Sequence, residues 1–315
     1  MTDPATMNRA TTSPVTPGLQ TSTAVLCTGR VYCDMIMAGL SAPPEPGREV
    51  YAERLTVAVG GGAYITAAYL QALGTAAGLA AILPAPPFSA VTAAELAASG
   101  IDLTWSEQAE AGADPQLTVA MIAGGDRAFV TRRVGRAVPA GISAALATGY
   151  FRHLHIGELA SLVETPGLVA QAKSAGMSVS ADCAWDTSLL ARTDLVAMLR
   201  GVDVFLPNRA EATALSRHAA LSDLAPLVVV KDGEKGAVAL SQGMQVARPV
   251  QVVDPVDTVG AGDAFNAGFL AAWLAGAGLA QCLDGGARTA RVALMRSGGA
   301  RGLAPLRSGN SEAAE

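Results

Sequence analysis

Short apolar runs alternate with longer Ala- and Leu-rich stretches along most of the chain. The runs AVLCTG, HLHI, MSVSA, VDVFL and LVVVK begin at residues 24, 153, 177, 202 and 227, and they are as short and apolar as buried strands. The stretches between them are long enough to be crossover helices. This alternation predicts a mostly parallel sheet with helices on both faces.

Two regions depart from this rhythm. Residues 34–60 contain two apolar runs around a Pro-rich loop, and LTVAMIAGGDRAFVTRR (117–133) has the pattern of two strands around a Gly-Gly-Asp turn. Together they predict a small antiparallel sheet that projects from the main body.

The ends of the chain differ from its middle. Residues 1–22 are rich in Thr, Pro and Ser and lack the apolar segment of a secretory signal, so we expect a disordered tail. Residues 308–315 are polar and should fray. The length of 315 residues fits one large α/β domain over residues 23–307.

The segment AFNAGFLAAWLAGAGLAQCL (264–283) is long and apolar enough to suggest a membrane span. Asn266, Gln281 and several glycines interrupt it, however. A helix buried between the sheet and its neighbours has the same composition, and we favour that interpretation.

Composition and charge narrow the classes of partner. The formal charge is -5, from 22 basic and 27 acidic residues without a long Lys/Arg run, which argues against nucleic acid and anionic membranes as partners. Four cysteines, at positions 27, 33, 183 and 282, show no CxxC spacing. They predict reduced, buried thiols in a cytoplasmic protein.

The strongest candidate for chemistry is DTVGAGDAFNAGF (257–269), in which a glycine-rich turn leads into a helix. Glycines ahead of a helix N-terminus let an anion approach the free backbone N–H groups, so Gly260, Ala261 and Gly262 form a candidate anion cradle. Asp263 could then either cap these N–H groups or accept a proton from a substrate hydroxyl. The segment alone leaves both roles open.

Three further motifs accompany this one: GGGAYITAAYLQALG (60–74), PNRAE (207–211) and VVVKDGEKGA (228–237). With DTVGAGDAF, the ordered set resembles the ribokinase-like (PfkB) carbohydrate kinase family over roughly residues 24–303. The resemblance implies a three-layer α/β/α sandwich with a small β-sheet lid. It also implies transfer of the γ-phosphoryl group of ATP to a sugar hydroxyl, with Mg2+ accompanying the nucleotide, and a homodimer that buries the apolar lid strands.

The resemblance assigns roles around the glycine turn. Asp263 would be the catalytic base, and the backbone N–H groups of residues 260–263 would form an anion hole for charge that builds up during transfer. Lys231, Gly233, Gly236 and Thr258 would bind ATP. Without the family context, KDGEKG would be an ordinary hairpin.

Two further sites would hold cations. Asn208 and Glu211 would act near the phosphates, with Glu211 reaching Mg2+ through water; the alternative is a helix cap at Asn208 with a solvated Glu211. Asp257, near Val259, matches a position that can face a monovalent cation such as K+.

On the acceptor side, Asp34 would accept hydrogen bonds from sugar hydroxyls, and Gly60 and Gly61 would let the sugar lie against the backbone. Ribokinase-type members carry Asn where this chain has Tyr32 and Ile65. Because two polar contacts to a ribose-like sugar are missing, we expect a less hydroxylated or more apolar acceptor than ribose.

Several other residues carry alternatives. Arg132 and Arg133, at the end of the second lid strand, either bind a carboxylate or phosphate of the acceptor or form a solvated strand edge. Trp185 either narrows the acceptor pocket or belongs to the core. His153 and His155 alternate on an apolar strand, and we interpret both as structural.

Other functions fit the sequence less well. A nucleotide-dependent dehydrogenase would need Gly-x-Gly-x-x-Gly after the first strand, which CTGRVYCD lacks. A non-catalytic sugar-binding sensor would lose the base or the anion hole, and both are present. A nucleoside kinase would share every catalytic motif, so it remains the alternative to a kinase of sugar-like small molecules.

Overall fold

The computed structural model describes residues 24–123, 126–304 and 306. Within this part of the chain, one large sheet has the strand order β14 (Met244–Arg248), β13 (Ala237–Ser241), β12 (Leu227–Lys231), β11 (Val204–Leu206), β10 (Ser178–Asp182), β9 (Phe151–Ile156), β1 (Ala24–Thr28) and β4 (Ala77–Ala80). Strands β12 to β4 in this order run parallel, whereas β13 and β14 are antiparallel additions at one edge. The five apolar runs lie in β1, β9, β10, β11 and β12, as the alternation predicts.

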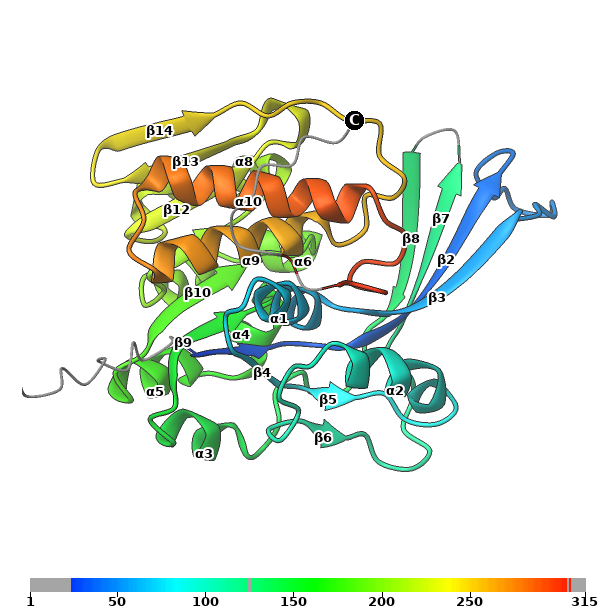
Figure 1. The fold of residues 1–315 in the computed structure, drawn as a ribbon, viewed down its shortest axis with the longest axis horizontal. Helices are drawn as coiled ribbons and strands as arrows, with labels where there is room; N and C mark the ends of the chain where they lie inside the picture. The colour runs from blue at the N-terminus through cyan, green and yellow to red at the C-terminus, as the bar shows by residue number, and fades with distance from the viewer. Residues whose placement is uncertain (1–23, 124–125, 305, 307–315) are drawn as a thin grey trace, which may run out of the picture.

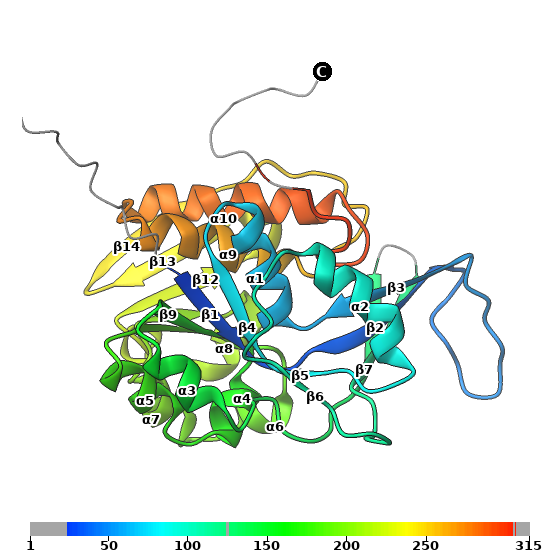
Figure 2. The same ribbon diagram turned by 60° about the horizontal axis from the view of Figure 1, so that its bottom comes forward.

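Helices cover both faces of this sheet (Figures 1 and 2). One face packs against α1 (Gly62–Ala72), α9 (Ala261–Leu274) and α10 (Leu279–Leu294), and the other against α3 (Ile142–Ala147), α4 (Leu159–Glu164), α5 (Leu168–Ser174), α7 (Leu195–Leu199) and α8 (Arg209–Leu215). Side chains of β1 alternate between the two cores, with Val25 and Cys27 in the first and Leu26 in the second. The predicted three-layer sandwich is therefore confirmed.

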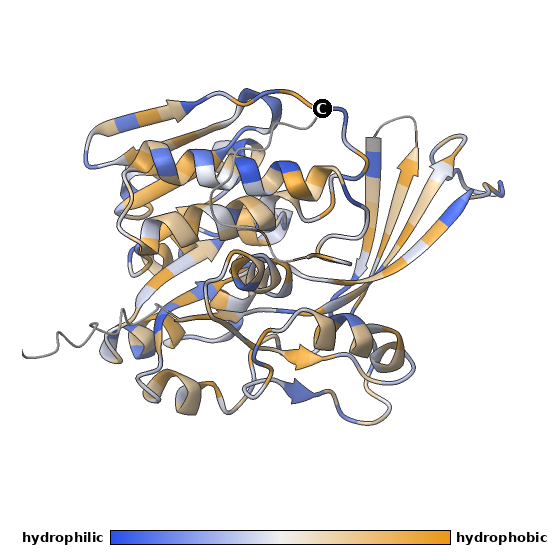
Figure 3. Ribbon diagram, viewed as in Figure 1, coloured by the Kyte–Doolittle hydropathy of each residue, from blue (hydrophilic) through white to orange (hydrophobic). Residues whose placement is uncertain are grey.

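The long apolar segment 264–283 is not one helix. It is divided between α9 and α10 by a turn that includes Gly276, whose φ is +79°. Figure 3 shows hydrophobic colours over most of α9, whereas hydrophilic and hydrophobic segments alternate along α10. No helix in the described part of the chain is long and apolar enough to cross a membrane. Residues 264–270 of α9 are buried, as the buried-helix interpretation predicts for this half of the segment.

A second sheet forms the lid beside the main body (Figure 1). Its strand order is β3 (Arg54–Gly60), β2 (Tyr32–Leu40), β7 (Leu117–Ala123) and β8 (Asp126–Arg132). The expectation of a purely antiparallel sheet is wrong, because β2 and β7 pair in parallel. Each of these two strands leaves the body outward and is followed by a strand that returns, which places two outgoing strands side by side.

The remaining elements are mostly short and lie between those already described. They are β5 (Ile82–Leu83), β6 (Glu107–Gln108), α2 (Phe88–Ala98), α6 (Thr187–Leu190), η1 (Leu221–Asp223) and η2 (Gly233–Lys235). On the lid, Leu55 and Val130 are 59% and 61% exposed. The homodimer expected from such apolar exposure stays a prediction.

Three sequence-based predictions fall partly or wholly outside the described residues. They are the terminal segments 1–22 and 308–315, and the turn at 124–125 between β7 and β8. The four cysteines, by contrast, are all described, and each is a buried free thiol, as their spacing predicts.

Candidate active site

A cavity of about 1160 Å3 lies between the lid and the carboxyl ends of the parallel strands. Its lining includes Tyr32, Thr118, Phe129 and Arg133 from the lid and its edge, Gly157, Asp182, Asn208 and Lys231 from the strand ends, and Ala261, Gly262 and Asp263 from α9. Ligands of open α/β sheets bind at this edge, because the loops after the strands converge there.

The N-terminus of α9 is open towards this cavity. Its N-cap is Gly260, which adopts φ +76° in the left-handed region and provides no side chain to cap the helix. The first N–H groups of a helix have no intrahelical acceptors, and glycine at this turn leaves the approach to them free of a Cβ. The predicted anion cradle therefore has the required backbone geometry, although Gly260 itself does not line the cavity.

Asp263 is the acidic residue in the first turn of α9, three residues after the N-cap Gly260. One carboxylate oxygen lies close to the start of α1, since a Cβ on Gly62 would be 2.8 Å from it. Burial, together with the nearby Asp182 carboxylate, raises the pKa of Asp263 to about 7. The carboxyl can therefore exchange a proton near neutral pH, as the role of a base requires.

Lys231 occupies the centre of a buried polar cluster next to this helix end. Its Nζ lies 3.0 Å and 2.9 Å from the two carboxylate oxygens of Asp182 and 3.0 Å from Oδ1 of Asn266. The Asn266 amide donates to Asp182 over 2.5 Å. Sequence reasoning assigned Lys231 to nucleotide binding but missed Asp182 and Asn266; the position of Asp182 at the carboxyl end of a predicted strand was the available signal.

Asn208 and Glu211 form a capping box at the start of α8. The Asn208 side chain accepts from the Glu211 N–H at 2.9 Å, and the Glu211 carboxylate accepts from the Asn208 N–H at 2.7 Å. The helix-cap alternative is thus correct for Asn208, but the solvated Glu211 is wrong, because this side chain is buried. Burial and the Asp182 carboxylate raise the pKa of Glu211 to about 7. Both residues line the cavity.

The hairpin after β12 forms another wall. Gly233, Gly236 and Thr258 line the cavity, as the prediction of a nucleotide-binding turn requires. Gly236 has φ +90°, and a Cβ there would lie 1.9 Å from the carbonyl oxygen of Arg248. The hairpin backbone is therefore packed too closely for any other residue.

The residues predicted to bind the acceptor, Asp34 and the Gly-Gly pair, do not themselves line the cavity. Asp34 is buried behind it, accepts a hydrogen bond from Thr118, and has a pKa raised by burial to about 7. Thr118 lines the cavity, whereas Asp34, Gly60 and Gly61 are not among its lining residues. Gly60 packs against the Asp34 carboxylate, and Gly61 against the backbone of Arg30.

The two departures from the family pattern behave differently. Tyr32 lines the cavity, so it replaces a polar contact with an aromatic one. Ile65 is buried, and Cβ atoms on Gly260 and Gly299 would lie 3.2 Å and 3.1 Å from its Cδ1. This side chain supports the glycine turn from behind, and the described cavity lining does not include it.

Charged side chains gather at the lid end of the cavity. Arg132 is exposed and paired with Asp114, whereas Arg133 donates to Asp186 at 2.6 Å. Asp186 also caps α6 through the backbone N–H groups of residues 188 and 189. Burial would raise the pKa of Asp186, but hydrogen bonds from Ser188 and Leu189 and the Arg133 charge lower it to about 2. Trp185 is 58% exposed and lines the cavity, so its assignment to the core is wrong.

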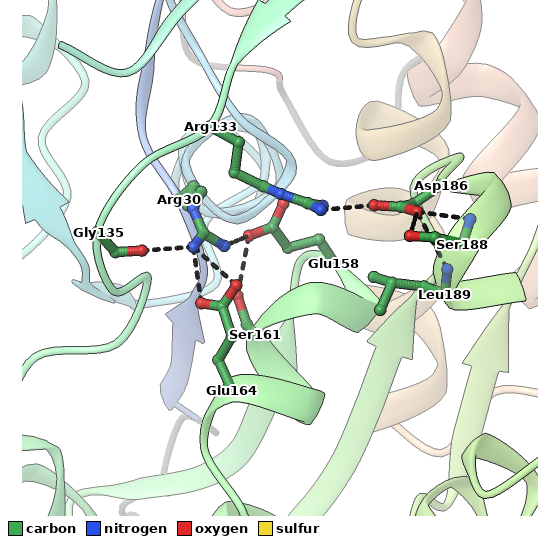
Figure 4. Close-up of polar contacts among 9 residues, drawn as sticks. All are labelled: Arg30, Arg133, Gly135, Glu158, Ser161, Glu164, Asp186, Ser188 and Leu189. Carbon is green, nitrogen blue, oxygen red and sulfur yellow. Dashed lines mark hydrogen bonds and ion pairs between the residues drawn. The ribbon is translucent and has the colours of Figure 1, made fainter. Parts of the chain in front are cut away.

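A second buried ionic cluster, which sequence reasoning missed, lies beside these residues (Figure 4). The Arg30 guanidinium donates to Glu158 at 2.9 Å, to Glu164 at 2.7 Å and to the carbonyl of Gly135 at 2.7 Å. Ser161 donates to the same Glu158 oxygen. Glu158 lines the cavity, so the Arg30 cluster reaches the cavity through this residue.

The carboxylate of Asp257 joins two loops. It accepts from the Val259 N–H at 2.9 Å and from the Gly298 N–H at 3.1 Å. Across residues 24–123, 126–304 and 306, no group of three or more His, Cys, Asp or Glu side chains could hold a metal ion. A monovalent cation at Asp257 remains a prediction.

His153 and His155 are buried in β9. His153 contacts the hydroxyls of Ser178 and Ser180 at 2.7 Å and 2.8 Å, and His155 contacts Ser180 at 2.8 Å. Burial lowers the pKa of His153 to about 3 and that of His155 to about 4, so both rings are neutral. These contacts agree with the structural role predicted for both.

Comparison with known proteins places this site in a family. The model of the pfkB family carbohydrate kinases matches residues 22–305. A 2-dehydro-3-deoxygalactonokinase of Haloferax volcanii is 28% identical over 275 residues, which are 80% of this chain and 86% of that protein.

Solved structures show the same fold. The adenosine kinase of Sinorhizobium meliloti has a TM-score of 0.73 at 21% identity, covering 90% of this chain and 97% of that one. A ribokinase II of E. coli in complex with ATP and Mg2+ has a TM-score of 0.68 at 20% identity, covering 89% and 94%. With the family match over most of its length, this chain belongs to the pfkB family of carbohydrate kinases.

Proposed function

We propose that this protein transfers the γ-phosphoryl group of ATP to a hydroxyl of a sugar-like small molecule, with Asp263 as the general base. The observation that carries this proposal is the meeting of three features in one cavity. These are the uncapped N-terminus of α9, the Asp263 carboxyl in its first turn, and the Lys231 ammonium beside it. Family membership supports the reaction type.

The chemistry follows from this placement. The acceptor hydroxyl gives its proton to Asp263 while its oxygen forms a bond to the γ-phosphorus. The bond from that phosphorus to the bridging oxygen of ADP breaks, and ADP leaves with the electron pair. The N–H groups at residues 260–263 stabilise the negative charge on the phosphoryl oxygens.

The nucleotide would extend from the glycine turn towards α10. Ala287, Ala290 and Leu294 of α10 line the same cavity as Gly233 and Thr258. They give the adenine ring of ATP an apolar surface to pack against. The small side chains of α10 carried no recognisable signal in the sequence.

Mg2+ would supply neutralising charge on the phosphates. Because the described residues hold no ready-made metal cluster, it fits best with phosphate and water ligands. Asn208 and Glu211 would hold those waters, since both line the cavity at this end. K+ at Asp257 would act only on the loops that this carboxylate joins.

The acceptor end favours a sugar acid. Arg132 and Arg133 line the cavity opposite the α9 turn, and a guanidinium matches the geometry of a carboxylate. The related protein of Haloferax volcanii is named as a 2-dehydro-3-deoxygalactonokinase. The exposed Trp185 and the cavity-lining Tyr32 keep a nucleoside as the second candidate acceptor, because both rings could stack on a base.

A screen of acceptors tests this proposal. Neutral sugars, 2-dehydro-3-deoxy sugar acids, sugar phosphates and nucleosides would be incubated with ATP and Mg2+ while ADP release is measured. We expect the highest kcat/KM for a sugar acid. A higher kcat/KM for a nucleoside would show that the acceptor is a nucleoside and not a sugar acid. If no acceptor stimulates ADP release, the proposed function is overturned.

A further inference from the structure

The Lys231 ammonium is held in a closed arrangement of three side chains. Asp182 on β10 binds it through both carboxylate oxygens, Asn266 on α9 accepts from it, and the Asn266 amide donates back to Asp182. Asp182 is 7% exposed and Asn266 is fully buried. Because a fully satisfied buried network is rigid, the ammonium has one well-defined position.

That position is at the start of α9. A Cβ on Gly262 would lie 3.6 Å from the Lys231 Nζ, so the ammonium is next to the second residue of the helix. An ammonium has three N–H donors. One serves Asn266 and one can be shared by the two Asp182 oxygens, which leaves a third for an anion in the cradle.

The charges around the cluster keep the Lys231 ammonium protonated, so that it can bind an anion in the cradle. Burial alone would lower the pKa of Lys231, but the carboxylates of Asp182 and Glu211 outweigh it and raise this pKa. Lys231 is therefore a permanent cation among several carboxylates, including Asp263. A phosphoryl group at the N-terminus of α9 would meet this cation and the helix N–H groups from adjacent directions.

We propose that Lys231 is a further catalytic residue, whose ammonium binds an oxygen of the transferring phosphoryl group, and that Asp182 and Asn266 are positioning residues that hold it at the α9 N-terminus. This inference rests on the proposed function. The competing role for Lys231 is to neutralise the buried Asp182 without touching the nucleotide.

The first test compares Lys231→Met with Lys235→Met. Lys235 is an exposed lysine in the same hairpin and does not line the cavity, so it controls for loss of a lysine charge. For Lys231→Met we expect kcat to fall about 100- to 1,000-fold, as when one donor to a developing anion is removed. Turnover equal to that of Lys235→Met would overturn the proposal.

A double variant separates catalysis from charge balance. Lys231→Met leaves a buried carboxylate without its partner, which can destabilise the fold, whereas Lys231→Met with Asp182→Asn removes both charges. We expect the double variant to regain thermal stability but to keep the loss in kcat. Recovery of kcat would show that Lys231 only neutralises Asp182.

Asn266→Leu tests the positioning role. Leucine keeps the approximate size but cannot accept from the ammonium, so we expect kcat to fall about tenfold while the KM for ATP stays near the wild-type value. A change confined to KM or to the melting temperature would contradict positioning of Lys231 for the chemical step.

Nucleotide binding gives a readout that needs no acceptor. Calorimetry would compare ADP–Mg2+ with and without aluminium fluoride, which mimics the transferring phosphoryl group. We expect fluoroaluminate to increase affinity in the wild type and this increase to shrink at least about tenfold in Lys231→Met, with ADP–Mg2+ affinity unchanged. If fluoroaluminate increases the affinity of Lys231→Met as much as that of the wild type, the role of Lys231 is overturned, even if an acceptor is found. If the screen finds no acceptor, the proposed function is overturned, but this binding comparison still decides the role of Lys231.

Discussion

Two buried groups of charged residues in this protein contain similar residue types but have different roles. In the Arg30 cluster, one guanidinium that is 2% exposed meets Glu158, Glu164 and a backbone carbonyl. At the start of α9, the carboxylates of Asp182, Glu211 and Asp263 act on Lys231. One guanidinium meets two carboxylates in the first group, whereas one ammonium faces three in the second, so the excess of acid is larger at α9.

The two groups of charges have different roles, one in stabilising the fold and one in the proposed chemistry. The Arg30 cluster joins the end of β1 to α4 and to the segment after the lid, and both terminal nitrogens of its guanidinium donate to acceptors within the protein (Figure 4). At α9, burial and, after it, the nearby Asp182 carboxylate raise the pKa of Asp263 to about 7, where a proton can be gained or lost.

The largest expected effect comes from removing the cation of the Arg30 cluster. Arg30→Met leaves Glu158 buried without its partner and should destabilise the protein by about 3–5 kcal/mol in chemical denaturation. Arg48→Met is the control, because Arg48 forms an ion pair with Glu45 while 75% exposed. That pair should contribute no more than about 1 kcal/mol. Equal losses in the two variants would show that the Arg30 cluster does not stabilise the fold.

A smaller effect is expected at the acceptor end of the cavity. Asp34→Ala removes the buried carboxyl that accepts from Thr118, and loss of a hydrogen bond of about 1–1.5 kcal/mol should raise the KM for the acceptor about tenfold. The KM for ATP should stay near the wild-type value, because Asp34 does not reach the nucleotide side. Equal losses for both substrates, measured by steady-state kinetics, would contradict the assignment of Asp34 to the acceptor.

The smallest effect is expected at the partly exposed arginine of the lid. Arg133→Gln should raise the KM for a sugar acid up to about fivefold, or about 1 kcal/mol, and leave a neutral acceptor unaffected. Arg136→Gln is a matched control, since Arg136 is also paired with an acid at 2.6 Å but does not line the cavity. An identical response to acidic and neutral acceptors would argue against recognition of a carboxylate by Arg133.

The sequence was sufficient to predict those elements whose structure is determined by neighbouring residues. The glycine turn at 260–263 and the helix that it begins are contiguous, and the strands of the main sheet follow from short apolar runs. The parallel pairing of β2 with β7 was missed because it depends on where each strand leaves the body.

Contacts between distant positions were beyond the reach of sequence reasoning. Asp182 and Asn266 are 84 residues apart, and Arg30 and Glu158 are 128 apart, so no local pattern joins them. Ile65 shows the converse limit: its place in the motif suggested a lost sugar contact, but its side chain packs against the glycine turn. Sequence alignment to a motif gives a position, and only packing gives the direction of the side chain.

The most direct test of the central claim, that the unmatched carboxyl of Asp263 is the catalytic base, is turnover of Asp263→Asn measured beside its thermal melting. Asparagine keeps the size of the side chain but cannot take the acceptor's proton, so turnover should fall at least about 100-fold with ATP affinity nearly unchanged. Because burial raises the folded-state pKa to about 7, above that of the unfolded chain, the ionised carboxylate destabilises the wild type above pH 7. The variant should therefore melt at a higher temperature than the wild type at pH 8, and this difference should shrink as the pH falls through about 7 and vanish near the unfolded pKa of about 4. Near-normal turnover together with a lower melting temperature would contradict the claim and make Asp263 a structural residue of α9.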